Sequence, residues 1–288
     1  MPGTLYIVAT PIGNLEDLTP RAAETFARAD FVAAEDTRVT LRLLNHLGLK
    51  KPLVSYYEHA LHHGGAILAR IEAGEDCALC SDAGMPCISD PGAVLVRDAL
   101  ERGIRVVPAP GASACVTALA VSGQDTARFV FEGFLPQQKK ERRARLDALR
   151  REERTILLYE APHKLRATLD DLAGALGPER SVTLCRELTK LHEEIVKTTL
   201  GAAVEYYRAN DPRGEYVLVV AGAQPGADGD GAPTRDDVVA AARRLLDAGE
   251  PLSSAARQAA AGTPFSRGEI YKALLEGRNT AEGDRGSE

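Results

Sequence analysis

Two aspartates lie in a short stretch of unusual composition, residues 81–92 (SDAGMPCISDPG). The stretch follows an apolar run, residues 76–80 (DCALC), whose length is typical of a buried strand. Its glycines can adopt backbone angles that other residues avoid and its prolines fix theirs, so we expect a rigid loop. Ligands bind at such strand ends in open α/β sheets, where Asp82 can accept hydrogen bonds from a ribose or an amine. The alternative for residues 90–92 is an ordinary helix start, with Asp90 as N-cap and Pro91 as first helical residue.

Two further loops rich in proline, glycine and serine end strand-like runs, at residues 10–14 (TPIGN) and 108–114 (PAPGASA). Backbone N–H groups at the start of the small-residue helix that follows residue 112 can bind a carboxylate or phosphate. Close packing of small residues on a sheet is the alternative. Neither GxGxxG nor GxxxxGK[ST] follows a predicted strand, which weakens nicotinamide and ATP sites. The three loops therefore suit a nucleoside-like ligand that is not held mainly through phosphates.

A basic segment lies in the second half of the chain. Residues 139–154 contain eight Lys/Arg against four Asp/Glu. The basic side chains crowd one end, so the sequence predicts contacts with RNA phosphates from Lys139, Lys140, Arg142, Arg143 and Arg145. A solvated helix face is the alternative.

Alternating strands and helices must position these residues. Strand-like runs at residues 4–10, 31–34, 53–57, 76–80 and 105–107 alternate with helical patterns, one of which begins with Thr19 as cap and Pro20 as first helical residue. This order predicts an α/β fold with a mainly parallel sheet and helices on its faces. From Phe129 a second set begins, with strands at 129–134, 155–159, 182–185 and 216–221.

The pattern divides the chain into five parts. We expect an N-terminal α/β domain over residues 1–123, a second α/β domain over 124–223 and a linker over 224–233. Residues 234–278 form a small helical module of helix-turn-helix length, and 279–288 a disordered tail. The module is either a nucleic-acid reader or a packing unit, and its few Lys/Arg favour packing.

Composition limits the function classes. The chain has 288 residues, 44% of them hydrophobic, and a net charge of −6, which opposes general coating of nucleic acid and still allows a local basic patch. No run reaches the length of a membrane span and the N-terminus lacks signal-peptide features, so we expect a cytoplasmic protein. Five cysteines fit a reducing compartment. Cys77 and Cys80 would point to opposite faces of a strand, so no metal site is predicted.

Taken together, the motifs resemble the tetrapyrrole methylase superfamily, and within it the ribosomal RNA small subunit methyltransferase I family. The matching stretches lie in order over about the first 220 residues: LYIVATPIGNLEDLTPRA (5–22), AAEDTR (33–38), SDAGMPCISDPG (81–92), PAPGASA (108–114), GFLPQQKKERR (133–143), YEAPHK (159–164), CRELTKLHEE (185–194) and GEYVLVV (214–220). The combination is far more specific than any one stretch. The C-terminal helices are weakly similar to the family's small tail module.

This resemblance implies two α/β domains with S-adenosylmethionine in the cleft between them, usually in a homodimer. It also implies methylation of the ribose 2′-hydroxyl of a cytidine in the decoding region of 16S rRNA, within the small ribosomal subunit. Carried over by position, the cofactor pocket takes Pro11, Gly13, Asp82, Gly84, Ser113 and Ala114 from the first domain. The second domain contributes Tyr159, Arg186, Glu187, Glu215 and Tyr216.

The implied reaction is an in-line displacement at a methyl carbon, which depends on alignment and benefits from a base. The sequence does not identify the base. Candidates are Glu35, Asp36 and Glu187, with Arg38 or Lys190 to stabilise the developing alkoxide. A salt bridge or helix cap is the alternative role for each. His59, His62 and His63 are expected to be surface residues beside the cleft.

Two other functions stay open at this point. One is a methyltransferase acting on a small tetrapyrrole precursor, since the superfamily contains such enzymes. The other is a non-catalytic RNA-binding factor for ribosome assembly, built on the basic segment and the C-terminal helices. The basic segment favours an RNA substrate over the first, and binding of S-adenosylmethionine would distinguish the enzyme from the second.

Overall fold

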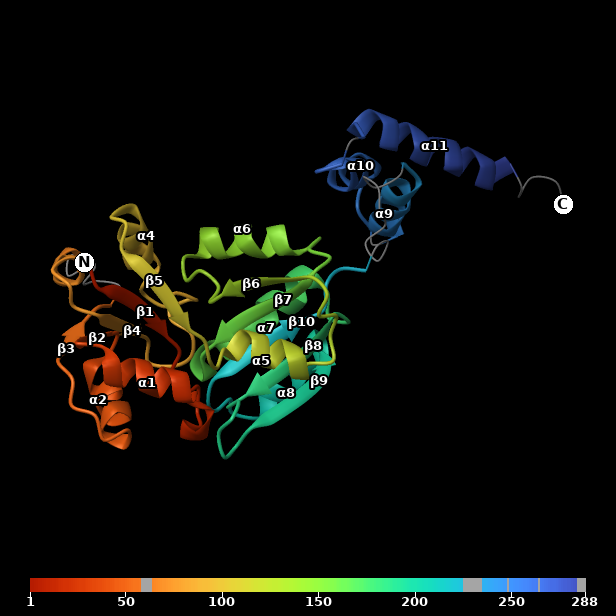
Figure 1. Ribbon diagram of the computed structural model, residues 1–288. Helices are drawn as coiled ribbons and strands as arrows, with labels where there is room; N and C mark the ends of the chain where they lie inside the picture. The colour runs from red at the N-terminus through yellow and green to blue at the C-terminus, as the bar shows by residue number, and fades with distance from the viewer. Residues whose placement is uncertain (58–63, 225–234, 248, 264, 284–288) are drawn as a thin grey trace. The chain divides into compact units, whose positions relative to one another are not determined.

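The first half of the chain forms a five-stranded, fully parallel sheet with the strand order β3-β2-β4-β1-β5 (Figure 1). The computed structural model describes residues 1–57, 64–224, 235–247, 249–263 and 265–283. The strands are β1 (Thr4–Val8), β2 (Phe31–Ala34), β3 (Leu53–Ser55), β4 (Cys77–Cys80) and β5 (Arg105–Ala109). The predicted parallel sheet is confirmed for this half.

Helices cover both faces of the first sheet. They are η1 (Leu15–Asp17), α1 (Pro20–Arg28), α2 (Thr37–His46), α3 (Gly64–Glu72) and α4 (Ala93–Glu101). Side chains of α3 and α4 pack with Cys77 in one buried cluster, whereas those of α1 and α2 pack with Cys80 in another. The two cysteines therefore lie on opposite faces, as predicted. The predicted cap is also confirmed, because the Thr19 hydroxyl accepts a hydrogen bond from the Ala22 N–H at 3.1 Å.

The second half forms a mixed five-stranded sheet with the order β6-β7-β10-β8-β9. β6 runs parallel to β7, and every other neighbouring pair is antiparallel. Its strands are β6 (Phe129–Gly133), β7 (Thr155–Glu160), β8 (Ser181–Arg186), β9 (Glu194–Thr199) and β10 (Tyr216–Val220). The sequence analysis missed β9, whose residues are largely exposed at the sheet edge and so show no apolar run.

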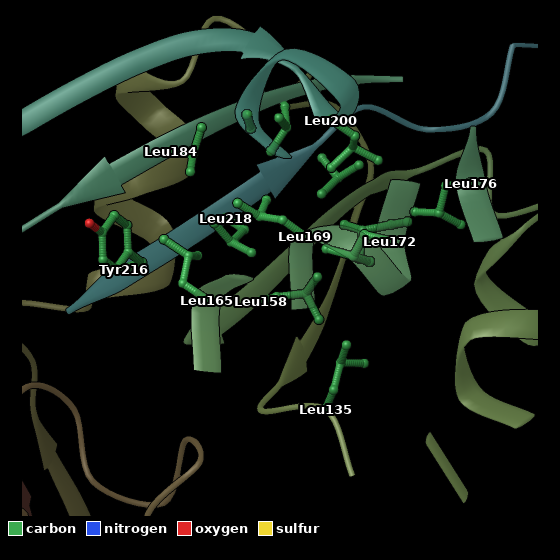
Figure 2. Close-up of a cluster of buried hydrophobic side chains, with 14 of the residues drawn as sticks. Leu135, Leu158, Leu165, Leu169, Leu172, Leu176, Leu184, Leu200, Tyr216 and Leu218 are labelled. Carbon is green, nitrogen blue, oxygen red and sulfur yellow. The ribbon is translucent and has the colours of Figure 1, made fainter. Parts of the chain in front are cut away.

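Four helices belong to the second sheet, α5 (Ala114–Val121), α6 (Lys139–Leu149), α7 (Pro162–Leu176) and α8 (Leu200–Ala209). Alternate side chains of the strands enter two cores, since neighbouring residues of a strand point to opposite faces. Leu158 and Leu218 pack with leucines of α7 and with Leu200 in the core of Figure 2. Leu157 and Val219 pack on the other face against α5.

Residues 1–223 form one compact unit that contains both sheets, and residues 224–288 form a second. The described residues of the second unit form three helices, α9 (Arg235–Asp247), α10 (Leu252–Ala260) and α11 (Arg267–Gly283), in agreement with the predicted helical module. They share a small apolar core that includes Val238, Ala256 and Ile270. α11 includes residues 279–283, where the sequence predicts the start of a disordered tail. Most of the predicted linker and residues 284–288 lie outside the described part of the chain.

Among the helices that the structure describes, none is long and apolar enough to cross a membrane. Within the same residues, no group of three His, Cys, Asp or Glu side chains is arranged to hold a metal ion.

Candidate active site

A hollow between the two sheets, called the central hollow here, is lined by both halves of the first unit. The first half contributes Ile12, Ala83, Gly84, Met85, Ile88, Asp90, Ser113 and Ala114. The second half contributes Phe134, Tyr159, Glu160, Ala161, Cys185, Glu187, Leu188, Lys190, Glu215, Tyr216 and Val217. Most of the predicted pocket residues are thus brought together from segments far apart in the sequence.

The loops that follow β1 and β4 are joined by backbone hydrogen bonds. Thr10 N–H donates to the Gly84 carbonyl at 2.9 Å, and Gly84 N–H donates to the Thr10 carbonyl at 3.1 Å. The Thr10 hydroxyl also donates to the Ser81 carbonyl at 3.1 Å. Because β1 and β4 are parallel neighbours, their loops leave the same edge of the sheet, which brings residues 10–14 beside residues 81–84.

The loop of residues 81–92 holds a strained backbone. Cys87 and Ser89 have φ values of 70° and 69°, in the left-handed region that non-glycine residues rarely adopt. Gly92 has φ 135°, and a Cβ there would lie 2.6 Å from Cys87 Sγ. Strain of this kind persists only where the surroundings fix it, which makes the loop a rigid wall of the central hollow.

The alternative role of Asp90 as a helix N-cap is wrong. α4 begins at Ala93, and its N-cap is Gly92. Asp90 lies instead along the central hollow, where burial raises the pKa of its carboxyl group. Residues 90–92 complete the loop before the helix starts, and local capping preferences could not reveal that.

Three acidic residues meet at the carboxyl ends of β2 and β4. Asp36 N–H donates to Asp82 Oδ1 at 3.0 Å, and Asp82 N–H donates to Glu35 Oε2 at 3.4 Å. Burial raises the pKa values of both the Glu35 and Asp82 carboxyl groups. These two groups hold protons more readily than fully solvated carboxylates do.

Asp36 has a different environment. Its carboxylate accepts hydrogen bonds from the Arg38 side chain, including one of 2.5 Å from Nη2, and from the Arg38 N–H at 2.8 Å. These hydrogen bonds lower the pKa of Asp36 to about 2. Asp36 therefore caps α2 and pairs with Arg38, in line with the cap and salt-bridge alternative.

Glu187, Lys190 and Glu215 form a charged group on the opposite wall of the central hollow. Lys190 Nζ lies 2.8 Å from both Glu187 Oε1 and Glu215 Oε2, and Glu187 Oε1 also accepts the Glu215 N–H at 2.9 Å. The hydrogen bond from Lys190 lowers the pKa of Glu187. Glu187 has φ 50°, and Thr189 has φ 66°, so this loop is strained as well.

Tyr159 connects the second sheet to the start of α5. Its hydroxyl accepts a hydrogen bond from the Cys115 N–H at 3.1 Å, in the first turn of the helix. The ring makes edge contacts with Phe131 and Phe134. Burial raises the pKa of the Tyr159 hydroxyl, so it stays neutral.

Three of the predicted cofactor residues line a different cavity, called the second hollow here. It is lined by Thr10, Pro11, Gly13, Asn14, Leu15, Val39, Thr40, Arg42, Leu43, Ser81 and Asp82. Pro11, Gly13 and Asp82 belong to this set, so their assignment to the cofactor stays a prediction. Arg186 lines neither hollow and forms an ion pair with Glu194 at 2.9 Å.

The sequence analysis did not single out several residues that line the central hollow. Ile12, Ile88 and Phe134 are apolar residues within the quoted motifs. Glu160 is a buried carboxylate that directly follows Tyr159 along β7. The position of the apolar residues between glycines and prolines is a signal that could have identified them.

The predicted RNA-binding residues on α6 differ in their surroundings. Arg142 Nε lies 2.6 Å from Asp171 Oδ2, and Arg142 Nη2 donates to the Thr168 hydroxyl at 2.9 Å. That hydroxyl donates in turn to Glu160 Oε2 at 2.5 Å. Arg142 therefore fixes α6 to α7 rather than facing solvent.

Arg145 on the same helix pairs with Glu132 at 3.3 Å. Lys139, Lys140 and Arg143 have exposed side chains and remain available for a phosphate backbone. His59, His62 and His63 lie outside the described residues.

Residues 4–204 match the protein family Tetrapyrrole (Corrin/Porphyrin) Methylases. The chain is 48% identical over 281 residues to "Ribosomal RNA small subunit methyltransferase I" of Synechocystis sp., covering 95% of this chain and 98% of that protein. It is 52% identical over 221 residues to the protein of the same name from Halalkalibacterium halodurans, covering 76% of each.

Among solved structures, the fold is similar to uroporphyrin-III C-methyl transferase from Thermus thermophilus, complexed with S-adenyl homocysteine. The TM-score is 0.55 at 18% sequence identity, and the match covers 76% of this chain and 97% of that one. This likeness concerns the two-sheet fold.

Proposed function

Since the chain belongs to the tetrapyrrole methylase family and, within it, to the ribosomal RNA small subunit methyltransferase I proteins, we propose that it uses S-adenosylmethionine to methylate the ribose 2′-hydroxyl of a cytidine in the decoding region of 16S rRNA. The observation that carries the proposal is the 48% identity over 95% of the chain to a relative with that name. Membership of the family supports methylation of small-subunit rRNA. The proposal adds that the target is the 2′-hydroxyl of a cytidine.

The central hollow fits S-adenosylmethionine by the chemistry of its lining. Ile12, Ile88 and Val217 offer an apolar surface for the adenosine part, and Gly84, with φ 82°, allows close approach of the main chain. Lys190 can bind the carboxylate of the amino-acid part, and Glu215 can bind its ammonium group. The residues present therefore match a ligand with an apolar ring system and a zwitterionic end.

When bound, S-adenosylmethionine supplies an electrophilic methyl group on a positively charged sulfur. The contribution of the chain is to orient the attacking oxygen and to exclude water, which the strained, hydrogen-bonded loops at residues 81–92 and 187–190 suit. Among the proton acceptors considered, Asp36 is held by Arg38 and Glu187 by Lys190, and both pKa values are lowered. Glu35 and Asp82, whose pKa values are raised by burial, are better suited to take a proton.

The RNA contact in this proposal involves the exposed basic residues of α6, Lys139, Lys140 and Arg143. We place the protein in the cytoplasm, where the small ribosomal subunit is found, and propose a homodimer as in the resemblance described above.

The test is transfer of radiolabelled methyl groups to purified 30S subunits, followed by mapping of the modified nucleotide. We expect label on one cytidine ribose of 16S rRNA. Label on a precorrin-type tetrapyrrole and none on 30S subunits would overturn the proposal, as would failure to bind S-adenosylmethionine.

The α6 contact is tested by the triple charge reversal of Lys139, Lys140 and Arg143 to Glu. The matched control reverses three exposed basic residues of the first half, Arg28, Lys50 and Arg105. We expect weaker binding to 30S subunits only in the α6 variant, with unchanged affinity for S-adenosylmethionine. Equal binding by the two variants would remove α6 from the RNA contact.

A further inference from the structure

The second hollow adjoins the central hollow. Both are built from the loops that follow β1 and β4, and consecutive residues contribute to different cavities. Gly13 and Asp82 line the second hollow, whereas Ile12 and Ala83, their immediate neighbours in sequence, line the central hollow. The two hollows therefore adjoin along these two loops.

The two halves of the first unit approach each other closely at Gly13. A Cβ at that position would lie 2.4 Å from Cγ of Lys190, which itself lines the central hollow. The absence of a side chain at Gly13 lets the loop of the second half approach the first half at the boundary of both cavities. Gly13 and Lys190 thus mark the place where the two hollows adjoin.

The lining of the second hollow combines three chemistries. Leu15 and Val39 are apolar and 48% and 37% exposed, which is unfavourable in water and suits contact with the face of a planar ring. Arg42 supplies an exposed guanidinium group of the kind that binds phosphate. Asp82 uses one carboxylate oxygen, Oδ1, for the Asp36 N–H, which leaves Oδ2 for a ligand hydroxyl.

A base, a phosphate and a sugar hydroxyl are the three parts of a nucleotide in RNA. We propose that the second hollow binds the acceptor nucleotide, with its base against Leu15 and Val39, its phosphate at Arg42 and its ribose hydroxyl at Asp82. This inference rests on the proposed function, and it assigns Asp82 to the acceptor in place of the cofactor.

The chemical step balances with these groups alone. A lone pair of the ribose 2′-oxygen forms the new bond to the methyl carbon, the bond from that carbon to sulfur breaks, and its electron pair stays on sulfur. The hydroxyl proton passes to the Asp82 carboxylate and then to water. The products are the methylated ribose and S-adenosylhomocysteine.

The test places a negative charge in the second hollow without touching the central one. Val39→Glu and Leu41→Glu change two exposed apolar residues of α2, of which only Val39 lines the second hollow. We expect Val39→Glu to lower kcat/KM for 30S subunits at least about tenfold, because a carboxylate repels the RNA backbone. Leu41→Glu should stay within about twofold of wild type, and both variants should bind S-adenosylmethionine as the wild type does.

A second variant, Asp82→Asn, keeps the shape of the side chain and removes its ability to take a proton. We expect a loss of kcat of at least about a hundredfold, with unchanged binding of S-adenosylmethionine. The wild-type rate should rise with pH as Asp82 ionises, and this rise should vanish in the variant.

The outcomes separate the two proposals. If wild-type protein labels 30S subunits and Val39→Glu labels them as fast as Leu41→Glu, the second hollow is not the acceptor site, while the proposed function stands. Loss of S-adenosylmethionine binding in Asp82→Asn would show that Asp82 binds the cofactor, and it would also overturn the inference. Absence of any label with wild-type protein would overturn the proposed function, and the inference with it.

Discussion

Gly214→Ala should damage the central hollow through one side chain, Glu187. Gly214 has φ 74°, and an added Cβ would lie 2.4 Å from Cγ and 2.7 Å from Oε1 of Glu187. Ordinary contacts begin at 3.4 Å, so the Glu187 side chain would have to move by about 1 Å. That movement breaks the hydrogen bonds that its carboxylate accepts from Lys190 and from the Glu215 N–H.

Gly103→Ala is the matched control. Gly103 has φ 70°, and nothing lies within 4 Å of the position of its Cβ. Both substitutions force alanine into a left-handed conformation, which costs about 1–2 kcal/mol. Only Gly214→Ala adds a collision, and only its collision reaches a residue of the central hollow.

The assays are urea unfolding and calorimetric titration with S-adenosylhomocysteine. Gly103→Ala should lose about 1–2 kcal/mol of unfolding free energy through backbone strain, and Gly214→Ala should lose more because it also breaks hydrogen bonds of Glu187. Gly214→Ala should weaken ligand binding at least about tenfold, since hydrogen bonds to charged groups contribute about 1.5–3 kcal/mol and 1.4 kcal/mol is a factor of ten. Gly103→Ala should bind within about twofold of wild type. Equal affinity in the two variants would refute the role of Glu187 in shaping the site.

Three other predictions concern buried groups around the site. Thr168→Val removes a hydroxyl that bonds two charged side chains and should lower the unfolding free energy by about 2 kcal/mol, whereas Thr25→Val, which loses only a bond to a helical carbonyl, should cost clearly less in the same urea titration. Tyr159→Phe leaves the Cys115 N–H without its partner and should cost about 1 kcal/mol and speed amide exchange at Cys115; unchanged exchange would count against the bond. The raised pKa of Asp90 means that the folded state binds its proton more tightly than the unfolded chain, so stability falls as pH rises from about 4 through the folded pKa. Asp90→Asn should therefore be more stable than wild type at pH 7 and equal to it in acid, and a less stable variant at pH 7 would contradict this assignment.

Local patterns predicted most of the first sheet and its loops because strong apolar strands and Pro/Gly turns carry their signal in a few residues. The buried apolar runs at β1, β2 and β4 clearly predicted strands, and the helices between them predicted that these strands are parallel. A loop at residues 81–92 was predictable for the same reason, whereas the left-handed backbone of Cys87 and Ser89 was not, since neither is glycine.

Long-range contacts were not predictable in the same way. The basic segment gave no sign that Arg142 pairs with Asp171 on α7, because charge pattern says nothing of partners distant in sequence. The edge strand β9 has no buried run to reveal it. The motif pattern could not show that Asp82 and Gly84 line different hollows.

A crystal structure of the protein with S-adenosylhomocysteine tests the central claim most directly. We predict density for the nucleoside in the central hollow, in contact with Gly84, Ala114 and Val217, and with its amino-acid end near Lys190. Density for the ligand at another place, or a central hollow filled by its own side chains in the presence of saturating ligand, would contradict the account.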